Sequence, residues 1–225
     1  MEYTEDGKKM INIIYEDNHL LVVEKKPNIP VQADDSKDED LLTILKKYIK
    51  EKYNKPGNVY LGLVHRLDRP VGGVMVFAKT SKAASRLSEQ VRTQKFEKIY
   101  HAVVEGKLNK KSDILKDRLL KDSKTNITRV DKNGKEAILE YELVSFKNNL
   151  SLVKIDLKTG RSHQIRVQFS SRGYPLYGDQ KYNKNAVKAQ IALYATSLSF
   201  NHPISGAKMT FNCNLPNIYP FNLFK

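Results

Sequence analysis

The densest group of residues that could do chemistry is the segment 65–73, with the sequence HRLDRPVGG. It places a single carboxylate, Asp68, between Arg66 and Arg69, and nearby positive charge favours the ionised form of a carboxylate. Pro70 and the glycine pair predict a turn in which the backbone can approach a ligand closely. Taken by itself, the segment is either a reactive carboxylate or, the commoner case, a surface turn with an ordinary ion pair.

A second candidate is the segment 159–166, with the sequence TGRSHQIR. Gly160 predicts a turn that leads into a helix, and Arg161, His163 and Arg166 lie close to the start of that helix. The N–H groups of a helix N-terminus, together with basic side chains, can bind a phosphate. The alternative is a helix whose basic side chains face solvent, and the residues alone favour neither interpretation.

Several kinds of enzyme are excluded by motifs that the sequence lacks. There is no G-x-x-x-x-G-K-[ST] phosphate loop, no G-x-G-x-x-G dinucleotide fingerprint and no G-x-S-x-G nucleophile elbow. The five histidines show no paired metal-ligand spacing, and the single Cys213 excludes a disulfide framework and the usual cysteine-rich zinc sites. A metal-dependent nuclease needs several clustered carboxylates, whereas the best segment offers only Asp68. The sequence therefore predicts an enzyme that uses one carboxylate and basic residues, with no metal and no cofactor.

The charge of the chain favours a nucleic-acid partner. Its 39 Lys and Arg residues outnumber 25 Asp and Glu, which gives a net charge of +14. Residues 107–135 contain ten Lys or Arg against four Asp, so they are expected to form a phosphate-binding surface; the alternative is an evenly solvated basic coat. No apolar run approaches the ~20 residues needed to span a bilayer. The first ten residues lack the apolar stretch of a secretory signal, so we expect a soluble, cytoplasmic protein.

Apolar periodicity predicts short strands interspersed with a few helices. We expect strands at residues 11–15, 20–24, 74–78, 100–105, 137–146, 150–157, 191–200 and 208–213, and helices at 41–53, from 81 onward and at 162–171. The acidic run 34–40 should cap the first helix and Ser81 the second, and Asn148-Asn149 predicts a hairpin turn. Few strand–helix–strand crossovers occur, so the expected fold class is α+β with a mixed, largely antiparallel central sheet, in a single domain over residues 1–225.

The order of the motifs along the chain resembles that of the RluA-type RNA pseudouridine synthases. The segment 65–73, followed by FAKT at 77–80, resembles the family's signature. The segments 159–167, YEDNHLLVV at 15–23, KIYHAVVEG at 98–106 and GYPLYGD at 173–179 resemble further motifs of the family. The resemblance covers nearly the whole chain. It implies the pseudouridine synthase fold, with an RNA cleft across the sheet near Asp68.

The resemblance also implies a reaction, in which uracil is detached from its ribose C1′, rotated and rejoined through C5 without a cofactor. By position, Asp68 is the essential carboxylate, Tyr100 stacks on the uracil, and Arg166 pairs with Asp68. Because a stacked uracil is out of reach, the base must be flipped out, and Arg66 resembles the residue that fills the vacated space. Further RNA contacts are expected from His65, Arg69, Arg161 and His163, with His65 also orienting its loop.

Some expectations are narrower. The family often has His where this chain has Gln168 and Tyr194, which puts fine substrate contacts in doubt. Only about ten residues precede the first predicted strand, so we expect no separate N-terminal S4 RNA-binding domain. The RNA is expected to be ribosomal RNA, transfer RNA or both, and the enzyme to be a monomer. The alternative function is a catalytically silent RNA-binding protein on the same fold, which would not require the trio of Asp68, Tyr100 and Arg166.

Overall fold

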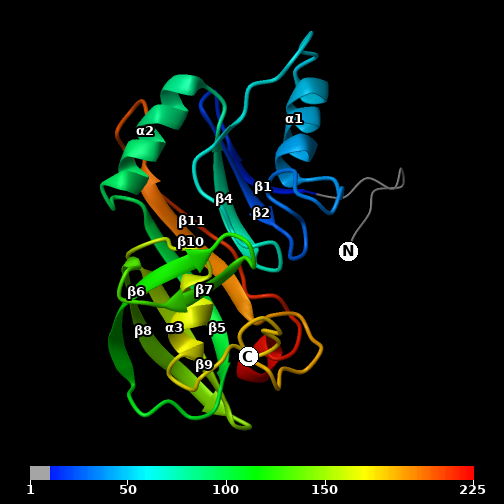
Figure 1. The fold of residues 1–225 in the computed structure, drawn as a ribbon. Helices are drawn as coiled ribbons and strands as arrows, with labels where there is room; N and C mark the ends of the chain where they lie inside the picture. The colour runs from blue at the N-terminus through cyan, green and yellow to red at the C-terminus, as the bar shows by residue number, and fades with distance from the viewer. Residues whose placement is uncertain (1–10) are drawn as a thin grey trace. The chain divides into compact units, whose positions relative to one another are not determined.

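The computed structural model describes residues 11–225; the first ten residues, in which the sequence shows no secretory signal, lie outside the described part. The chain divides into two compact units (Figure 1). The first unit takes the residues up to Phe96 together with Leu198–Cys213, and the second takes Glu97–Ser197 and Asn214–Lys225. Strand β10 (Leu193–Asn201) begins in the second unit and ends in the first.

The first unit contains a sheet with the strand order β1-β2-β4-β10, in which β3 also pairs with β4 and β11 with β10. Its strands are β1 (Asn12–Glu16), β2 (Leu20–Lys25), β3 (Gly62–Leu63), β4 (Gly72–Ala78), β11 (Lys208–Asn212) and the end of β10. Strand β4 is buried along its whole length. This burial explains why its sequence reads as a continuous apolar run rather than an alternating one.

Two helices, α1 (Leu41–Lys52) and α2 (Ser81–Arg92), belong to the first unit (Figure 1). The side chain of Asp40 accepts a hydrogen bond from the N–H of Thr43, which confirms that the acidic run caps α1. The second predicted cap is wrong by one residue, since the hydroxyl of Thr80 accepts from Ala83 at the start of α2. Both Thr80 and Ser81 are good capping residues, so sequence alone cannot choose between them.

The second unit contains a sheet with the strand order β10-β5-β9-β8-β6-β7. Its elements are β5 (Glu97–Glu105), β6 (Ser112–Asp122), β7 (Ile127–Val130), β8 (Lys135–Lys147), β9 (Leu150–Leu157), the helix α3 (Gln164–Ser170), the start of β10 and a short 3₁₀ helix (Phe221–Phe224). The predicted β8–β9 hairpin is confirmed: Asn148 and Asn149 both have positive φ angles, as its two-residue turn requires.

The predicted fold class is confirmed. The pairs β1–β2, β2–β4, β3–β4, β5–β9, β6–β7, β6–β8 and β8–β9 are all antiparallel. The predicted strands and helices are present with shifts of a few residues at their ends, whereas β3, β6 and β7 were not predicted. No helix within residues 11–225 is long and apolar enough to cross a membrane.

Candidate active site

Asp68 lies in a tight turn just before β4. Its carbonyl accepts a hydrogen bond from the N–H of Val71 at 2.9 Å, which closes the turn around Arg69 and Pro70. Leu67 is buried and anchors the turn, while the Asp68 side chain is partly exposed. The chain can therefore present a carboxylate at a fixed place without burying it away from a substrate.

The buried side chain of Lys25 holds the turn of Asp68 in place by hydrogen bonds. Lys25, the last residue of β2, is fully buried, and its Nζ donates to the carbonyls of Lys26, Arg69 and Val71 at 3.1, 2.9 and 2.8 Å. Burial lowers the pKa of Lys25 to about 7, and the negative charge of Asp68 partly offsets that effect. The structure thus ties Asp68 to β2 through a residue that the sequence did not single out.

The other predicted residues of this loop have distinct surroundings. The Nε2 atom of His65 accepts a hydrogen bond from the N–H of Val76 on β4 at 3.1 Å, so His65 links the loop to β4, and its contact with RNA stays a prediction. The guanidinium of Arg69 pairs with Asp38 and lies 3.6 Å from Asp34, so the acidic run does more than cap α1. Arg66 is exposed, as a residue that enters an RNA stack would have to be.

Arg166 occupies the second unit, on α3, and is buried. Its Nε and Nη2 atoms donate to the two carboxylate oxygens of Asp179 at 2.8 and 2.7 Å. Asp179 also accepts from the N–H groups of Lys181 and Tyr182. The Nη1 atom of Arg166 takes no part in this two-point pair, and the predicted ion pair between Arg166 and Asp68 stays a prediction.

Tyr100 lies on β5 and is buried. Lys98, two residues earlier, projects from the same face of the strand, because strand side chains alternate. Its Nζ lies beside Gly160: a Cβ placed on that glycine would be 3.4 Å from the amine. Burial lowers the pKa of Lys98, and Asp156 opposes that shift. The turn before α3 therefore lies beside the end of Lys98, a side chain on the same face of β5 as Tyr100.

The remaining predicted residues lie at the start of α3. His163, the residue before the helix, has a left-handed backbone with φ 52°, and its Nδ1 atom lies 2.6 Å from the hydroxyl of Tyr182. Arg161 is exposed, and its Nε donates to the carbonyl of Glu136 on β8 at 2.7 Å. Arg161 and His163 thus flank the helix start near Arg166, whereas the loop of Asp68, His65, Arg66 and Arg69 belongs to the first unit.

The unusual Gln168 is a structural residue. It is fully buried, and its amide nitrogen contacts the carbonyl of Leu115 and the carboxylate of Asp117 at 3.2 and 2.7 Å. Its amide oxygen accepts from Gln164 at 3.0 Å. These contacts tie α3 to β6, and the effect of Gln168 on substrate contacts stays a prediction.

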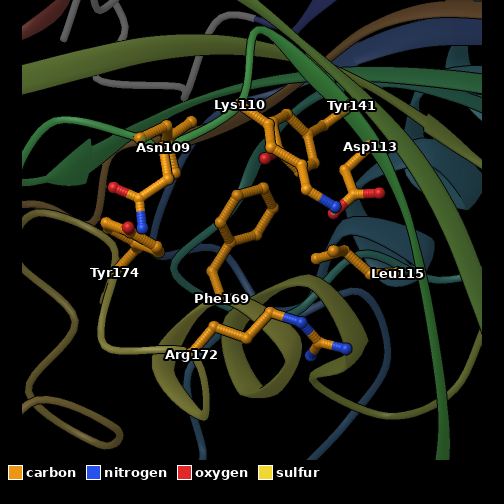
Figure 2. A pocket seen from close by; sticks show the side chains of 9 residues that line it. Asn109, Lys110, Asp113, Leu115, Tyr141, Phe169, Arg172 and Tyr174 are labelled. Carbon is orange, nitrogen blue, oxygen red and sulfur yellow. The ribbon is translucent and has the colours of Figure 1, made fainter.

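A small cavity of about 190 Å³ lies at the far end of α3 (Figure 2). Phe169 is one of its lining residues and lies in the middle of the view, between Asn109 and Tyr174 on one side and Leu115 on the other. The two cations at its rim are paired with acids: Lys110 with Asp113, and Arg172 with Asp117. This balance of charge does not favour an anion, and none of the predicted catalytic residues lines the cavity.

Within the described residues no three His, Cys, Asp or Glu side chains gather as metal ligands would. The candidate site contains instead the partly exposed carboxylate of Asp68, on a turn that Lys25 holds by hydrogen bonds. It also contains the buried Arg166, whose guanidinium is oriented by the carboxylate of Asp179. Sequence reasoning missed four residues that contact the candidate site residues or their loops: Lys25, Lys98, Asp179 and Tyr182. Only Asp179 gave a signal, as the last residue of the 173–179 motif.

Comparisons with known proteins agree with this arrangement. A family model described as RNA pseudouridylate synthase matches residues 19–171. "Ribosomal large subunit pseudouridine synthase D" of Zymomonas mobilis is 34% identical over 222 residues, which cover 92% of this chain and 69% of that protein. "Ribosomal large subunit pseudouridine synthase C" of Buchnera aphidicola is 34% identical over 220 residues, and the match covers 92% of this chain and 68% of that protein.

A solved structure confirms the predicted fold. "Human RNA Pseudouridylate Synthase Domain Containing 4" superposes with a TM-score of 0.80 at 23% identity, covering 95% of this chain and 92% of that one. At that level of identity the likeness establishes the fold alone.

Proposed function

We propose that this chain, which belongs to the RluA-type family of RNA pseudouridine synthases and isomerises uridine in RNA, acts on ribosomal RNA of the large subunit with Asp68 as its essential carboxylate. The observation that carries the proposal is the family match over residues 19–171, which includes Asp68, Tyr100 and Arg166. The choice of ribosomal RNA is supported by the names of the two bacterial relatives.

The reaction conserves atoms and electrons. The bond between ribose C1′ and uracil N1 breaks, and a bond between C1′ and C5 forms. The proton on C5 leaves, and N1 gains a proton. The formal oxidation state of C1′ falls by one and that of C5 rises by one, so the two changes cancel and no outside oxidant or reductant is needed. The protein therefore has to supply only charge, orientation and a place for each proton.

Each of the three residues has a proposed part. Asp68 supplies the negative charge at the reacting uridine, and its turn is held still by the hydrogen bonds of Lys25. Tyr100 offers an aromatic face on which the extruded uracil stacks. Arg166, whose guanidinium is oriented by Asp179, has the part of keeping Asp68 ionised, as the family resemblance implies.

Binding is proposed to come from the basic segment 107–135, much of which forms the β6–β7 hairpin, with Arg66, Arg161 and His163 as local contacts. Exposed lysines such as Lys116 and Lys121 would contact phosphates rather than bases, and would position the RNA without reading its sequence. We expect a monomer that acts in the cytoplasm, where ribosomal RNA is assembled, and transfer RNA remains a second RNA to be tested.

The experiment is the release of tritium from RNA labelled at uracil C5, with wild type and Asp68→Asn assayed side by side. The substrate is ribosomal RNA from cells that lack this enzyme, and transfer RNA from the same cells is the parallel substrate. We expect wild type to release tritium from ribosomal RNA, and Asp68→Asn to bind that RNA with similar affinity and release none.

Measurable turnover by Asp68→Asn would contradict the role of that carboxylate. Release from transfer RNA alone would contradict the choice of ribosomal RNA. Binding without release by wild type would favour a silent RNA-binding protein instead.

A further inference from the structure

Tyr182 lies at a junction of three parts of the second unit: strand β7, the start of α3 and the Arg166 guanidinium. Its hydroxyl accepts a hydrogen bond from the N–H of Thr128 on β7 at 2.9 Å and lies 2.6 Å from Nδ1 of His163. The Arg166 guanidinium sits over its ring, with Cζ 5.1 Å from the ring centroid. One side chain therefore contacts the strand, the helix cap and the buried arginine.

The Tyr182 hydroxyl has one hydrogen and two lone pairs, so it can accept from the N–H of Thr128 and also form a hydrogen bond with Nδ1 of His163, whichever of these two groups donates. Burial raises the pKa of Tyr182, so the hydroxyl keeps its proton at neutral pH.

The loop that holds Tyr182 is itself anchored on both sides. Its backbone N–H donates to Asp179, the partner of Arg166, and its carbonyl accepts from the hydroxyl of Ser170 on α3 at 2.6 Å. The neighbouring Lys181 donates to the carbonyl of Asn126 in the β6–β7 turn at 3.0 Å. The loop thus joins the hairpin to the same carboxylate that orients Arg166.

Strand β7 depends on this junction. Within residues 11–225 it is the last strand in the order and pairs only with β6, so its outward N–H groups have no strand neighbour there. An edge N–H that is not exposed to water needs a partner, and Thr128 is buried. The hydroxyl of Tyr182 is that partner, so Tyr182 links β7 to the arginine, in addition to the contacts by which Gln168 ties α3 to β6.

We infer that Tyr182 is a positioning residue, which holds the RNA-binding β6–β7 hairpin and the Arg166 guanidinium in a fixed relation while uridine is isomerised. The inference rests on the proposed parts of Arg166 and of the basic segment 107–135. The ring and the hydroxyl have separable tasks: the ring orients Arg166, and the hydroxyl attaches the hairpin.

The test compares Tyr182→Phe, which keeps the ring, with Tyr182→Leu, which removes it. Tyr219→Phe is the matched control, since Tyr219 is half exposed and lies outside the junction. Single-turnover tritium release is measured against RNA concentration, which gives a maximal rate and an apparent Kd. Hydrogen exchange of residues 127–130 is measured on the same proteins without RNA.

We expect Tyr182→Phe to keep the wild-type maximal rate and to weaken the apparent Kd about tenfold, because it loses two hydrogen bonds. Tyr182→Leu should weaken the apparent Kd as much and also lower the maximal rate about three- to tenfold, since Arg166 loses its aromatic support. Exchange of residues 127–130 should be faster in both variants and unchanged in Tyr219→Phe.

Equal maximal rates in the Phe and Leu variants would overturn the role of the ring, and wild-type exchange in Tyr182→Phe would overturn that of the hydroxyl. If wild type releases no tritium from any RNA, the proposed function is wrong, and the proposed role of Tyr182 in the reaction is then wrong as well. The exchange measurement tells this apart from a failure of the contacts, because it needs no substrate.

Discussion

Arg166 and Asp179 form a buried two-point ion pair, with both contacts at or below 2.8 Å and Asp179 only 1% exposed. Two backbone N–H groups, those of Lys181 and Tyr182, also donate to the carboxylate. A buried ion pair adds little net stability, because removing two charges from water offsets their attraction. Removing one partner is nevertheless costly, because it leaves a buried charge uncompensated. The pair therefore serves to hold the guanidinium in one orientation.

Asp179→Asn should destabilise the protein strongly. The amide keeps the shape of the carboxylate but removes the negative charge that faces Nε and Nη2 of the buried Arg166, and breaking a buried ion pair in this way costs about 3–5 kcal/mol of unfolding free energy. Urea unfolding followed by circular dichroism measures the change. Asp113→Asn is the control, because Asp113 pairs with Lys110 at the surface and its loss should leave the unfolding curve unchanged. Equal curves for Asp179→Asn and wild type would show that the pair carries no stability.

Lys25→Met should free the turn of Asp68 and change how stability depends on pH. It leaves the carbonyls of Lys26, Arg69 and Val71 without their shared donor, which should cost about 2–4 kcal/mol. Between pH 7 and 10.5 the unfolded chain holds a proton that folded Lys25 has released, so unfolding takes up a proton. The unfolding free energy of wild type therefore rises with pH in this window, by up to about 1.4 kcal/mol per unit.

The variant lacks this titrating group, so the stability gap between wild type and Lys25→Met should widen from pH 7 to pH 9.5. Lys26→Met is the matched control, because Lys26 is the exposed neighbour of the same type. Its pH dependence should follow that of wild type. Parallel pH curves for wild type and Lys25→Met would mean that Lys25 stays charged across the window.

The sequence predicts those elements whose apolar residues recur with the same period as the residues that are buried in the folded chain. Leu41, Leu45 and Ile49 recur every four residues and are the buried face of α1, and the uninterrupted run of β4 is buried on both faces. Strand β6 was not predicted, because only Leu115 and Leu119 of its eleven residues are buried and charged residues surround them. A strand with so little apolar alternation looks like a basic loop.

The residues of the candidate site likewise divide into those that the sequence could identify and those that it could not. The residues in compact motifs could be named from the sequence, including Asp68 and Arg166, and His65 links its loop to β4 by a hydrogen bond. Lys25 could not be recognised, because it stands beside Lys26 and its acceptors lie up to 46 residues away. Tyr182 could not be recognised either, because its role depends on its loop lying beside the edge of strand β7.

The basic hairpin should account for part of the salt dependence of RNA binding. Lys116 and Lys121 are exposed on β6, and removing one lysine–phosphate interaction should lower the slope of log Kd against log salt by about one. We expect the double variant Lys116→Gln, Lys121→Gln to reduce the slope by about two, measured by filter binding between 50 and 200 mM salt, a range in which such interactions are sensitive. The control double variant Lys50→Gln, Lys82→Gln removes the same charge from α1 and α2 of the first unit. If both pairs change the slope equally, binding follows net charge rather than the hairpin.

Arg66→Ala should separate base flipping from chemistry. Arg66 is exposed on the turn of Asp68, next to the anchored Leu67, so its removal should leave the turn in place. A guanidinium can stack where a base has left, and unstacking costs a few kcal/mol only when the target uridine is stacked. We therefore expect Arg66→Ala to lose at least tenfold in single-turnover rate on a structured RNA, which is about 1.4 kcal/mol, and to lose little on a short unstructured RNA with the same uridine. Arg86→Ala on α2, which removes a guanidinium from another part of the first unit, should convert both RNAs at the wild-type rate. An equal loss by Arg66→Ala on both RNAs would assign Arg66 to the chemical step or to folding instead.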